Sequence, residues 1–217
     1  MPKDFLEKIK EGRTFRDMHS ILAIRKKDDG TEEDGIIEGY ATVFNKAYQL
    51  GEFKWGDKKV RILEIVDKNA FDGCDMKDVI LQYDHQGRVI ARTNNNTLKL
   101  QCDSHGLNVV AKLNGTSYGR ELLEEIRGGY SNKMSFGFIV QEDVRDEHEE
   151  NDVVTITRTI TKISKLFDVS VVSIPANDAT EVSARSFGDG VIKELESERA
   201  KREQINILKR KINIYTM

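Results

Sequence analysis

Between residues 20 and 174, short segments of alternating apolar and polar residues follow one another, separated by glycine-bearing or charged turns. A period of two is the pattern of a β-strand with one buried face. The 16 glycines fall mostly between these segments, and only two prolines occur, Pro2 and Pro175. Strands joined by turns are therefore predicted for most of the chain, and the fold class is α+β, mainly β.

The clearest hairpin is formed by TLKLQCD and LNVVAKL, which are joined by the turn SHG. Leu98, Leu100 and Cys102 alternate strictly with polar residues and share one face. The acidic segment RDEHEEND is expected to be a loop. The predicted strands cover residues 20–26, 35–44, 60–66, 79–85, 97–103, 107–113, 133–144, 153–163 and 165–174.

One helix interrupts the strands and is predicted over 117–127. The hydroxyl of Ser117 can accept a hydrogen bond from a free N–H of the first turn. Tyr118, Leu122 and Ile126 recur at fourfold spacing and give the helix an apolar face. The two glycines that follow favour the left-handed turn that ends a helix.

The composition changes near residue 190, where glycine and proline disappear and charges of both signs alternate. This pattern predicts a solvated helix, either packed on its own domain or serving as a partner-binding or removable tail. The predicted organisation is an N-terminal extension (1–19), a strand-rich domain (20–187) and a charged helical C-terminal tail (188–217).

Composition limits the classes of function. Of the 217 residues, 38% are hydrophobic and 33% are charged, as in a soluble globular protein, and the net charge of −3 gives no argument for nucleic-acid binding. No apolar run could cross a membrane and the first residues lack a secretion signal, so a cytoplasmic location is expected. Cys74 and Cys102 form neither a metal-type pair nor a disulfide framework and are expected to be small buried residues. No metal or organic cofactor is indicated.

The segment NKMSFGF contains a serine whose role is open on this evidence. In a strand, Met134, Phe136 and Phe138 point to one face, and Ser135 and Gly137 point to the other. The missing side chain at Gly137 leaves a gap beside the hydroxyl, which would suit an approaching substrate. The alternative is a structural hydroxyl bonded to a neighbouring strand. A nucleophilic serine needs a base within hydrogen-bond reach and a polar partner that fixes the tautomer of that base.

Among the four histidines, His85 is the candidate base, because it lies where an apolar strand meets a turn and a scaffold can hold it rigidly. His19, His105 and His148 are expected to be solvated surface residues. Asp84 is expected to bond turn amides rather than to orient the adjacent histidine, because adjacent strand residues point to opposite faces.

A carboxylate interrupts the apolar segment KLFDVSVVSI at Asp168. Burying a charge is costly unless the charge is paired, so Asp168 requires a partner. That partner is either a histidine or a lysine or arginine in a salt bridge. Ser170 lies on the same face of the strand and could donate a further hydrogen bond.

The chain resembles the tailed-bacteriophage prohead protease family, maturation proteases related to herpesvirus assemblin. The resemblance covers roughly residues 20–185 and depends on six segments in the family order. The segments are IEGYATVFN, EIVDKNAF, YDHQGRVIAR, SHGLNVVAKL, GGYSNKMSFGF and LFDVSVVSIPAN.

This resemblance implies an assemblin-like β-barrel flanked by helices. It implies that His85 is the general base, Ser135 the nucleophile and Asp168 the third catalytic residue, at a position where the family usually has glutamate. Ala91 replaces a usual glycine, and Arg92 matches a basic residue of the family without gaining a role from the match.

The resemblance also implies a serine endopeptidase that cleaves scaffolding protein, or the scaffolding segment of the major capsid protein, during prohead maturation. It further implies self-cleavage, in which the C-terminal tail would be trimmed, and a location inside the assembling prohead in the host cytoplasm. The expected partners are scaffolding or capsid protein, with a homo-oligomer also compatible, and neither nucleic acid nor a membrane. The alternative is a non-enzymatic assembly factor with a protease-like barrel.

Overall fold

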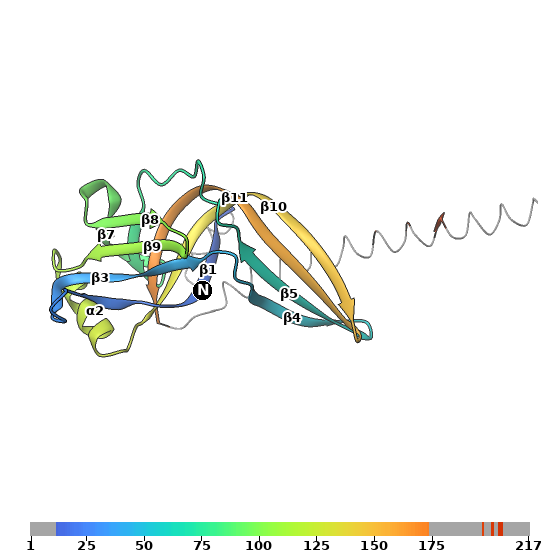
Figure 1. Ribbon diagram of the computed structural model, residues 1–217, viewed down its shortest axis with the longest axis horizontal. Coiled ribbons are helices and arrows are strands. Elements are labelled where there is room, and N and C mark those ends of the chain that lie inside the picture. The colour runs from blue at the N-terminus through green and yellow to red at the C-terminus, as the bar shows by residue number, and fades with distance from the viewer. Residues whose placement is uncertain (1–11, 174–196, 198–200, 202–203, 206–217) are drawn as a thin grey trace, which may run out of the picture.

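The computed structural model describes residues 12–173 and four single positions nearer the C-terminus, Ser197, Lys201, Gln204 and Ile205. Within the described chain, strands dominate and one α-helix, α2, is present (Figure 1). The strands are β1 (Thr14–Ile21), β2 (Ala23–Lys26), β3 (Glu32–Val43), β4 (Tyr48–Trp55), β5 (Lys58–Val66), β6 (Ile80–Tyr83), β7 (Gln86–Arg92), β8 (Leu98–Cys102), β9 (Gly106–Lys112), β10 (Lys133–Glu150) and β11 (Val153–Val172). The helices are the 3₁₀ turn η1 (Thr93–Asn95) and α2 (Ser117–Arg127).

The strands form two open sheets. The seven-stranded sheet has the order β1-β10-β11-β5-β4, with β6 paired to β11 and β7 paired to β6. The four-stranded sheet has the order β2-β3-β9-β8. Neither strand order closes on itself among the residues that the structure describes. The mainly-β prediction is confirmed, whereas the closed barrel with flanking helices is not found in this part of the chain.

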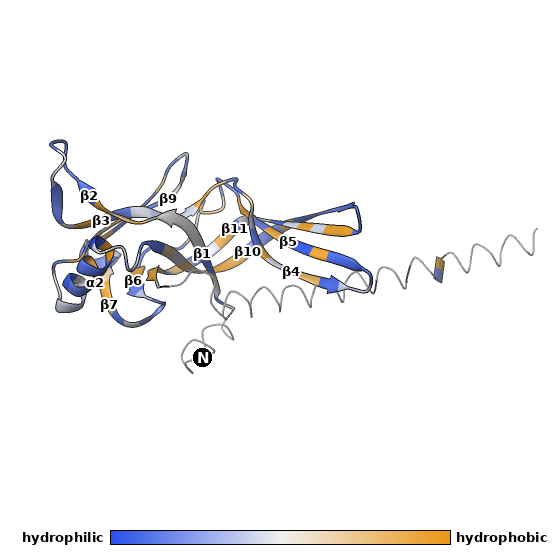
Figure 2. Cartoon of the chain, turned by 90° about the horizontal axis from the view of Figure 1, so that it is seen from below, coloured by the Kyte–Doolittle hydropathy of each residue, from blue (hydrophilic) through white to orange (hydrophobic). Residues whose placement is uncertain are grey.

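One hydrophobic core joins the two sheets. It includes Ile37 and Val109 from the four-stranded sheet and Met134 and Phe136 from the seven-stranded sheet, all fully buried. Figure 2 shows the alternation of apolar and polar residues along the strands that produces this core. Met134, Phe136 and Phe138, which were predicted to share one face of β10, all belong to this core.

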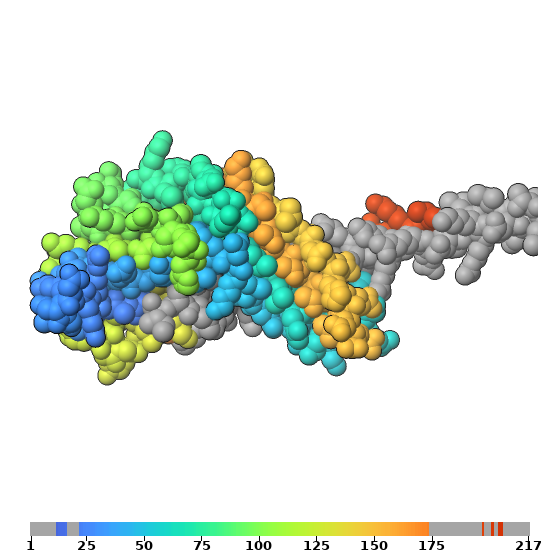
Figure 3. Space-filling model, viewed as in Figure 1, coloured from blue at the N-terminus to red at the C-terminus, as the bar shows by residue number. Residues whose placement is uncertain are grey.

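Strand β11 is the central strand of the larger sheet. It runs for 20 residues and pairs along one edge with two parallel strands, β5 beside Val153–Ile160 and β6 beside Asp168–Val171. Two separate strands and an acidic loop were predicted here. The acidic residues instead belong to β10, and the chain turns only at Asn151 and Asp152, both with positive φ. With β4 and β5, the ends of β10 and β11 project from the body as an arm (Figures 1 and 3).

The hairpin β8–β9 and the helix at 117–127 agree with the predictions. The cap of α2 lies one residue earlier than expected, because the Thr116 side chain, rather than that of Ser117, accepts from the Gly119 amide at 3.0 Å. The buried face of α2 includes Leu122 and Ile126. Tyr118 is exposed instead.

The predicted domain limits fall partly on undescribed residues. Strand β1 spans the predicted boundary at residues 19 and 20, so the end of the predicted extension is hydrogen-bonded into the larger sheet. The predicted C-terminal tail, residues 188–217, lies outside the described residues except for the four single positions.

Candidate active site

The structure brings the three predicted site residues into one hydrogen-bonded chain. Ser135 Oγ donates to Nε2 of His85 over 2.6 Å, and Nδ1 of His85 donates to Oδ1 of Asp168. The residues come from β10, the β6–β7 turn and β11, and are separated by 50 and 83 positions from the histidine in sequence. An alcohol, an imidazole and a carboxylate in this order are the parts of a serine nucleophile with its base and orienting group.

Pairing between β10 and β11 places the serine and the carboxylate on the same face. Ser135 lies opposite Ser170, and Gly137 lies opposite Asp168, in antiparallel register. Directly opposite residues of two paired strands point the same way, and so do residues two apart on one strand. The two polar side chains are therefore diagonal neighbours on the face opposite the phenylalanines.

His85 reaches this face from a tight turn at the end of β6. Tyr83 pairs with Val171 on β11 and with Gln86 on β7, so Asp84 and His85 form the two-residue turn. Both have positive φ, 47° and 58°. Such a turn normally uses glycine or asparagine, and a histidine in this conformation has a local cost. Costly backbone conformations cluster at functional sites.

Asp84 fixes the turn to the end of β11. Its carboxylate accepts from the amide and the hydroxyl of Ser173, both at 2.9 Å, and its own amide donates to the Val171 carbonyl at 2.9 Å. The prediction that this carboxylate bonds turn amides is therefore corrected, because its partners belong to the end of a neighbouring strand. The strand that carries Asp168 thus also holds the turn that carries His85.

Asp168 is buried, and its partners explain how the sequence tolerates it there. It is 2% exposed and accepts from the His85 imidazole and, at 3.0 Å, from the hydroxyl of Ser170. The histidine partner that was considered for it is present, as is the predicted contribution of Ser170. Hydrogen bonds to a buried carboxylate offset the loss of its hydration.

The space left by the missing side chain at Gly137 was predicted to suit a substrate, but protein side chains occupy it. A Cβ at this position would collide with the Asp168 carboxylate and would lie 2.8 Å from Cε1 of Phe15. The space beside Ser135 is therefore filled by the carboxylate and a phenylalanine ring and is not open to a substrate. Glycine at 137 lets the carboxylate approach the sheet closely enough to face His85.

The whole triad is withdrawn from solvent. Ser135 is 0% exposed and His85 5%. Electrostatic interactions are stronger where water is excluded, so the carboxylate acts on the imidazole with little screening. In this arrangement a substrate cannot reach the hydroxyl of Ser135.

Other candidate nucleophiles and bases with described side chains lie apart from this cluster, and the side chain of His19 is outside the described part of the chain. His105 is exposed, and so is the side chain of His148, 3.9 Å from Glu150. Both cysteines are free, and burial raises the pKa of the half-buried Cys74 to about 11, which keeps its thiol protonated at neutral pH. Cys102 is exposed, which corrects the expectation of a small buried residue.

Arg92, which was given no role, forms a surface ion pair. Its Nε donates to Asp78 at 2.6 Å. No group of three or more histidine, cysteine or acidic residues within the described segments is arranged to hold a metal ion. No helix there is long and apolar enough to span a membrane.

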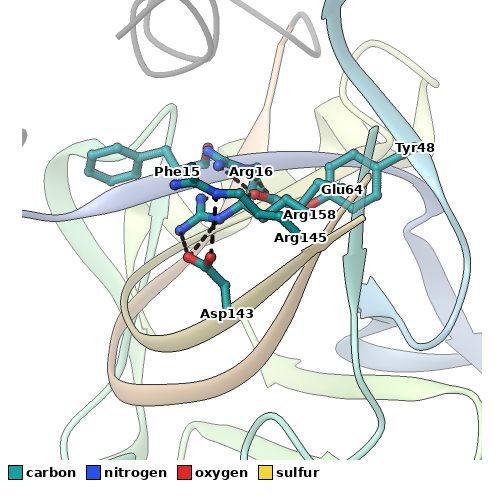
Figure 4. A network of polar contacts seen from close by, with 7 residues as sticks. All are labelled: Phe15, Arg16, Tyr48, Glu64, Asp143, Arg145 and Arg158. Atoms are coloured by element: carbon teal, nitrogen blue, oxygen red, sulfur yellow. Dashed lines mark hydrogen bonds and ion pairs between the residues drawn. The ribbon is translucent and has the colours of Figure 1, made fainter. Parts of the chain in front are cut away.

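Sequence reasoning missed the contribution of β1. Its residue Phe15 contacts His85, and its neighbour Arg16 is one of the most deeply buried side chains described. Figure 4 shows Arg16 in a polar network with Tyr48, Glu64 and Arg158. Phe15 and Arg16 lie in the segment that was assigned to an N-terminal extension, and nothing in TFRDM distinguishes a buried arginine from an exposed one.

An open groove lies beside the turn that carries His85. It has a volume of about 550 Å³, and Tyr83, Gln86, Ile90 and Tyr118 are among the residues that line it. The Arg88 guanidinium stacks on the Tyr118 ring, with Cζ 4.5 Å from the ring centre. The groove combines apolar and aromatic walls with hydrogen-bonding groups, a lining that is typical of ligand sites.

Comparison with known proteins gives two matches. The family described as caudovirus prohead serine protease matches residues 21–191, more than half of the chain. The prohead protease of Enterobacteria phage HK97 is 28% identical over 166 residues, a match that covers 76% of this chain and 66% of that relative, just under two thirds of its length. No solved structure matches the chain.

Proposed function

The chain belongs to the caudovirus prohead serine protease family, and we propose on this basis that it is a serine endopeptidase of capsid maturation with Ser135, His85 and Asp168 as its catalytic residues. One observation supports the assignment of these roles above all others. The Ser135 hydroxyl lies 2.6 Å from a histidine nitrogen whose ring is held on its other side by a carboxylate. Membership of the family indicates the class of reaction, and this contact indicates which residues would act as the nucleophile and its base.

In the proposed reaction, Ser135 Oγ attacks the carbonyl carbon of a peptide bond while Nε2 of His85 accepts the hydroxyl proton. The imidazolium then gives that proton to the departing amine, which leaves an acyl-enzyme. Water, deprotonated by His85, attacks the ester and releases Ser135. Asp168 keeps the proton on Nδ1 before the attack and stabilises the imidazolium during it.

The proposed substrates are the internal scaffolding protein or the scaffolding segment of the major capsid protein, and the chain itself. The resemblance in sequence supports this choice, and the match to a relative named prohead protease supports the setting. We place the substrate chain along the groove beside the His85 turn, because its lining includes Asp84 and Gln86, the residues on either side of His85 in sequence. Tyr83 and Tyr118 offer this chain apolar surfaces.

The competing proposal is an assembly factor that binds capsid or scaffold without cutting it. The complete burial of Ser135 favours this alternative, since a covered hydroxyl does not meet a substrate. Against it stands the intact hydrogen-bonded triad. A buried, hydrogen-bonded set of serine, histidine and aspartate side chains has no evident purpose in a protein that only binds its partners.

Co-expression with the capsid or scaffolding protein separates the two proposals. The wild-type chain should shorten the partner, as measured by intact mass, and Ser135→Ala should leave the partner at full mass. Ser131→Ala is the matched control, because Ser131 is also a buried serine but lies 3.4 Å from Glu125, outside the triad. Equal cleavage by Ser135→Ala and wild type, or no cleavage by either, would favour the assembly factor.

Self-cleavage needs a separate experiment. Purified wild-type chain and Ser135→Ala are incubated side by side and their intact masses are followed. We expect the wild-type chain, but not Ser135→Ala, to lose mass at its C-terminal end. Full-length chains in both samples, under conditions that cleave scaffold, would contradict self-cleavage and leave the endopeptidase proposal standing.

A further inference from the structure

A phenylalanine from the first described strand packs against the proposed catalytic base. The rings of Phe15 and His85 lie with centroids 4.5 Å apart and planes at 62°, an edge-to-face arrangement. Phe15 is 1% exposed. Aromatic pairs favour this geometry because the positive edge of one ring meets the negative face of the other.

The register of β1 directs Phe15 to this place. Phe15 lies opposite Gly137 on β10, so its side chain shares the face of Ser135 and Asp168. The missing side chain at Gly137 leaves room for the ring, whose Cε1 would be 2.8 Å from a Cβ there. Phe15 therefore adjoins both His85 and the position occupied by the Asp168 carboxylate.

The next residue anchors the strand on its other face. Arg16 forms a two-point ion pair with Glu64 of β5, in which Nη2 is 2.9 Å from Oε2, and its Nη1 donates to the Phe15 carbonyl at 2.8 Å. Glu64 is 0% exposed and also accepts from Tyr48 and, at 3.2 Å, from Arg158 (Figure 4). Breaking such a buried pair would leave an uncompensated charge, so the register of β1 is strongly fixed.

We propose that Phe15 is a positioning residue for the general base: its ring fixes the plane of the His85 imidazole and excludes water from the His85–Asp168 hydrogen bond, while the Arg16–Glu64 pair holds the strand that carries it. The inference depends on the proposed function, because it assigns a role within the same reaction. A small tilt of the imidazole would move Nε2 away from Ser135 Oγ, and misplacement by about 1 Å can cost roughly 100-fold in rate.

The test uses a probe that reports the reactivity of the serine without needing the natural substrate. Diisopropyl fluorophosphate reacts with an activated serine: Oγ bonds to phosphorus, fluoride leaves and the base takes the proton. We expect Phe15→Leu to lower the second-order labelling rate of the full-length chain by about tenfold or more. Phe15→Met keeps most of the side-chain volume without the ring, and it should also lower the labelling rate. This second variant keeps the test decisive if Phe15→Leu fails to fold.

A matched control separates positioning from loss of packing. Phe138 is equally buried and stacks on Phe136 in the core, on the face of β10 opposite the triad. Phe138→Leu should lower the melting temperature about as much as Phe15→Leu but keep the wild-type labelling rate. A second readout is the downfield proton resonance of His85 Nδ1–H, which should broaden or shift in both Phe15 variants and not in Phe138→Leu.

The outcomes are distinguishable. Wild-type labelling rates and an unchanged resonance in both Phe15 variants would overturn the positioning role, as would an equal loss in Phe138→Leu. Labelling that persists in Ser135→Ala would instead contradict the proposed function. If the wild-type chain does not label, the resonance alone decides, because it reports the His85–Asp168 hydrogen bond without any reaction.

Discussion

At the scale of single residues, the proposed site depends on a buried carboxylate, Asp168. Asp168 is short, yet it meets His85 because Gly137 allows it close to the sheet and because the turn brings the histidine over it. The interruption of an apolar strand by a charge predicted that Asp168 needs a partner. It could not predict the close approach, which depends on a glycine, Gly137, directly opposite on the neighbouring strand β10.

Replacement of Asp168 by asparagine should leave the fold intact and remove most of the activity. The amide would favour the wrong tautomer of His85, and the labelling rate of Ser135 should fall by about 10³-fold or more. Comparison of labelling rates with thermal unfolding curves checks this. A variant that labels as fast as wild type would show that the carboxylate is structural.

Gly137→Ala should damage the site more than the fold. The added methyl would collide with the Asp168 carboxylate and press on Phe15, displacing the carboxylate from His85. We expect a stability loss of about 1–3 kcal/mol and a fall in labelling rate of about tenfold or more.

Gly115→Ala is the control for that variant, because a Cβ at Gly115 would meet nothing within 4 Å. This control should change neither the unfolding free energy nor the labelling rate. Full activity of Gly137→Ala would mean that the carboxylate can be displaced without consequence, contrary to the proposed role of Asp168.

At the scale of elements, sequence periodicity predicted strands well where one face is buried and poorly where strands are long or polar. The hairpin β8–β9 and helix α2 appear as expected because their patterns are local. Strand β7 was missed because its residues follow a turn formed by Asp84 and His85, without the glycine or asparagine that marks such turns. The acidic end of β10 was missed because pairing with β11, and not its own composition, makes it a strand.

The ion pair that joins β1 to β5 should make stability depend on pH. Burial by itself would raise the pKa of the Glu64 carboxyl, but Arg16 and Arg158, with the Tyr48 hydroxyl, outweigh it and hold the pKa below its ordinary value. Because the folded pKa is lower than the unfolded one, the pair stabilises the fold above the unfolded pKa of about 4.3, and this contribution disappears as pH falls through the folded pKa.

Urea unfolding of wild type and Glu64→Gln across the range from about pH 7 to about pH 3 measures this contribution. At neutral pH, Glu64→Gln should lose about 3–5 kcal/mol, since it leaves Arg16 buried without its counter-charge. The difference between the two proteins should narrow toward the acidic end. The exposed Glu52, paired with Lys59 at 2.7 Å, supplies the control Glu52→Gln, which should change stability little. A constant difference at all pH values would contradict the assigned role of Glu64.

At the scale of the whole molecule, two paired strands, β10 and β11, and the distant β6–β7 turn bring the proposed catalytic groups together at a buried site. Residues 20–185 carried enough local signal to identify the family and to name His85, Ser135 and Asp168. The two open sheets and the arm were not predictable, because they depend on which strands pair, and alternating segments of similar length do not specify their neighbours. The burial of Ser135 was also not predictable, since the exposed fraction of a side chain depends on tertiary packing that the local sequence does not reveal.

The most direct test of the account is to locate the covalent adduct after reaction of the full-length chain with diisopropyl fluorophosphate. Peptide mapping by mass spectrometry should find the diisopropyl phosphoryl group on Ser135 in the wild-type chain and not in His85→Gln, since the 2.6 Å contact makes the imidazole the base. An adduct on another serine, or equal modification of Ser135 in His85→Gln, would contradict the proposed nucleophile and base.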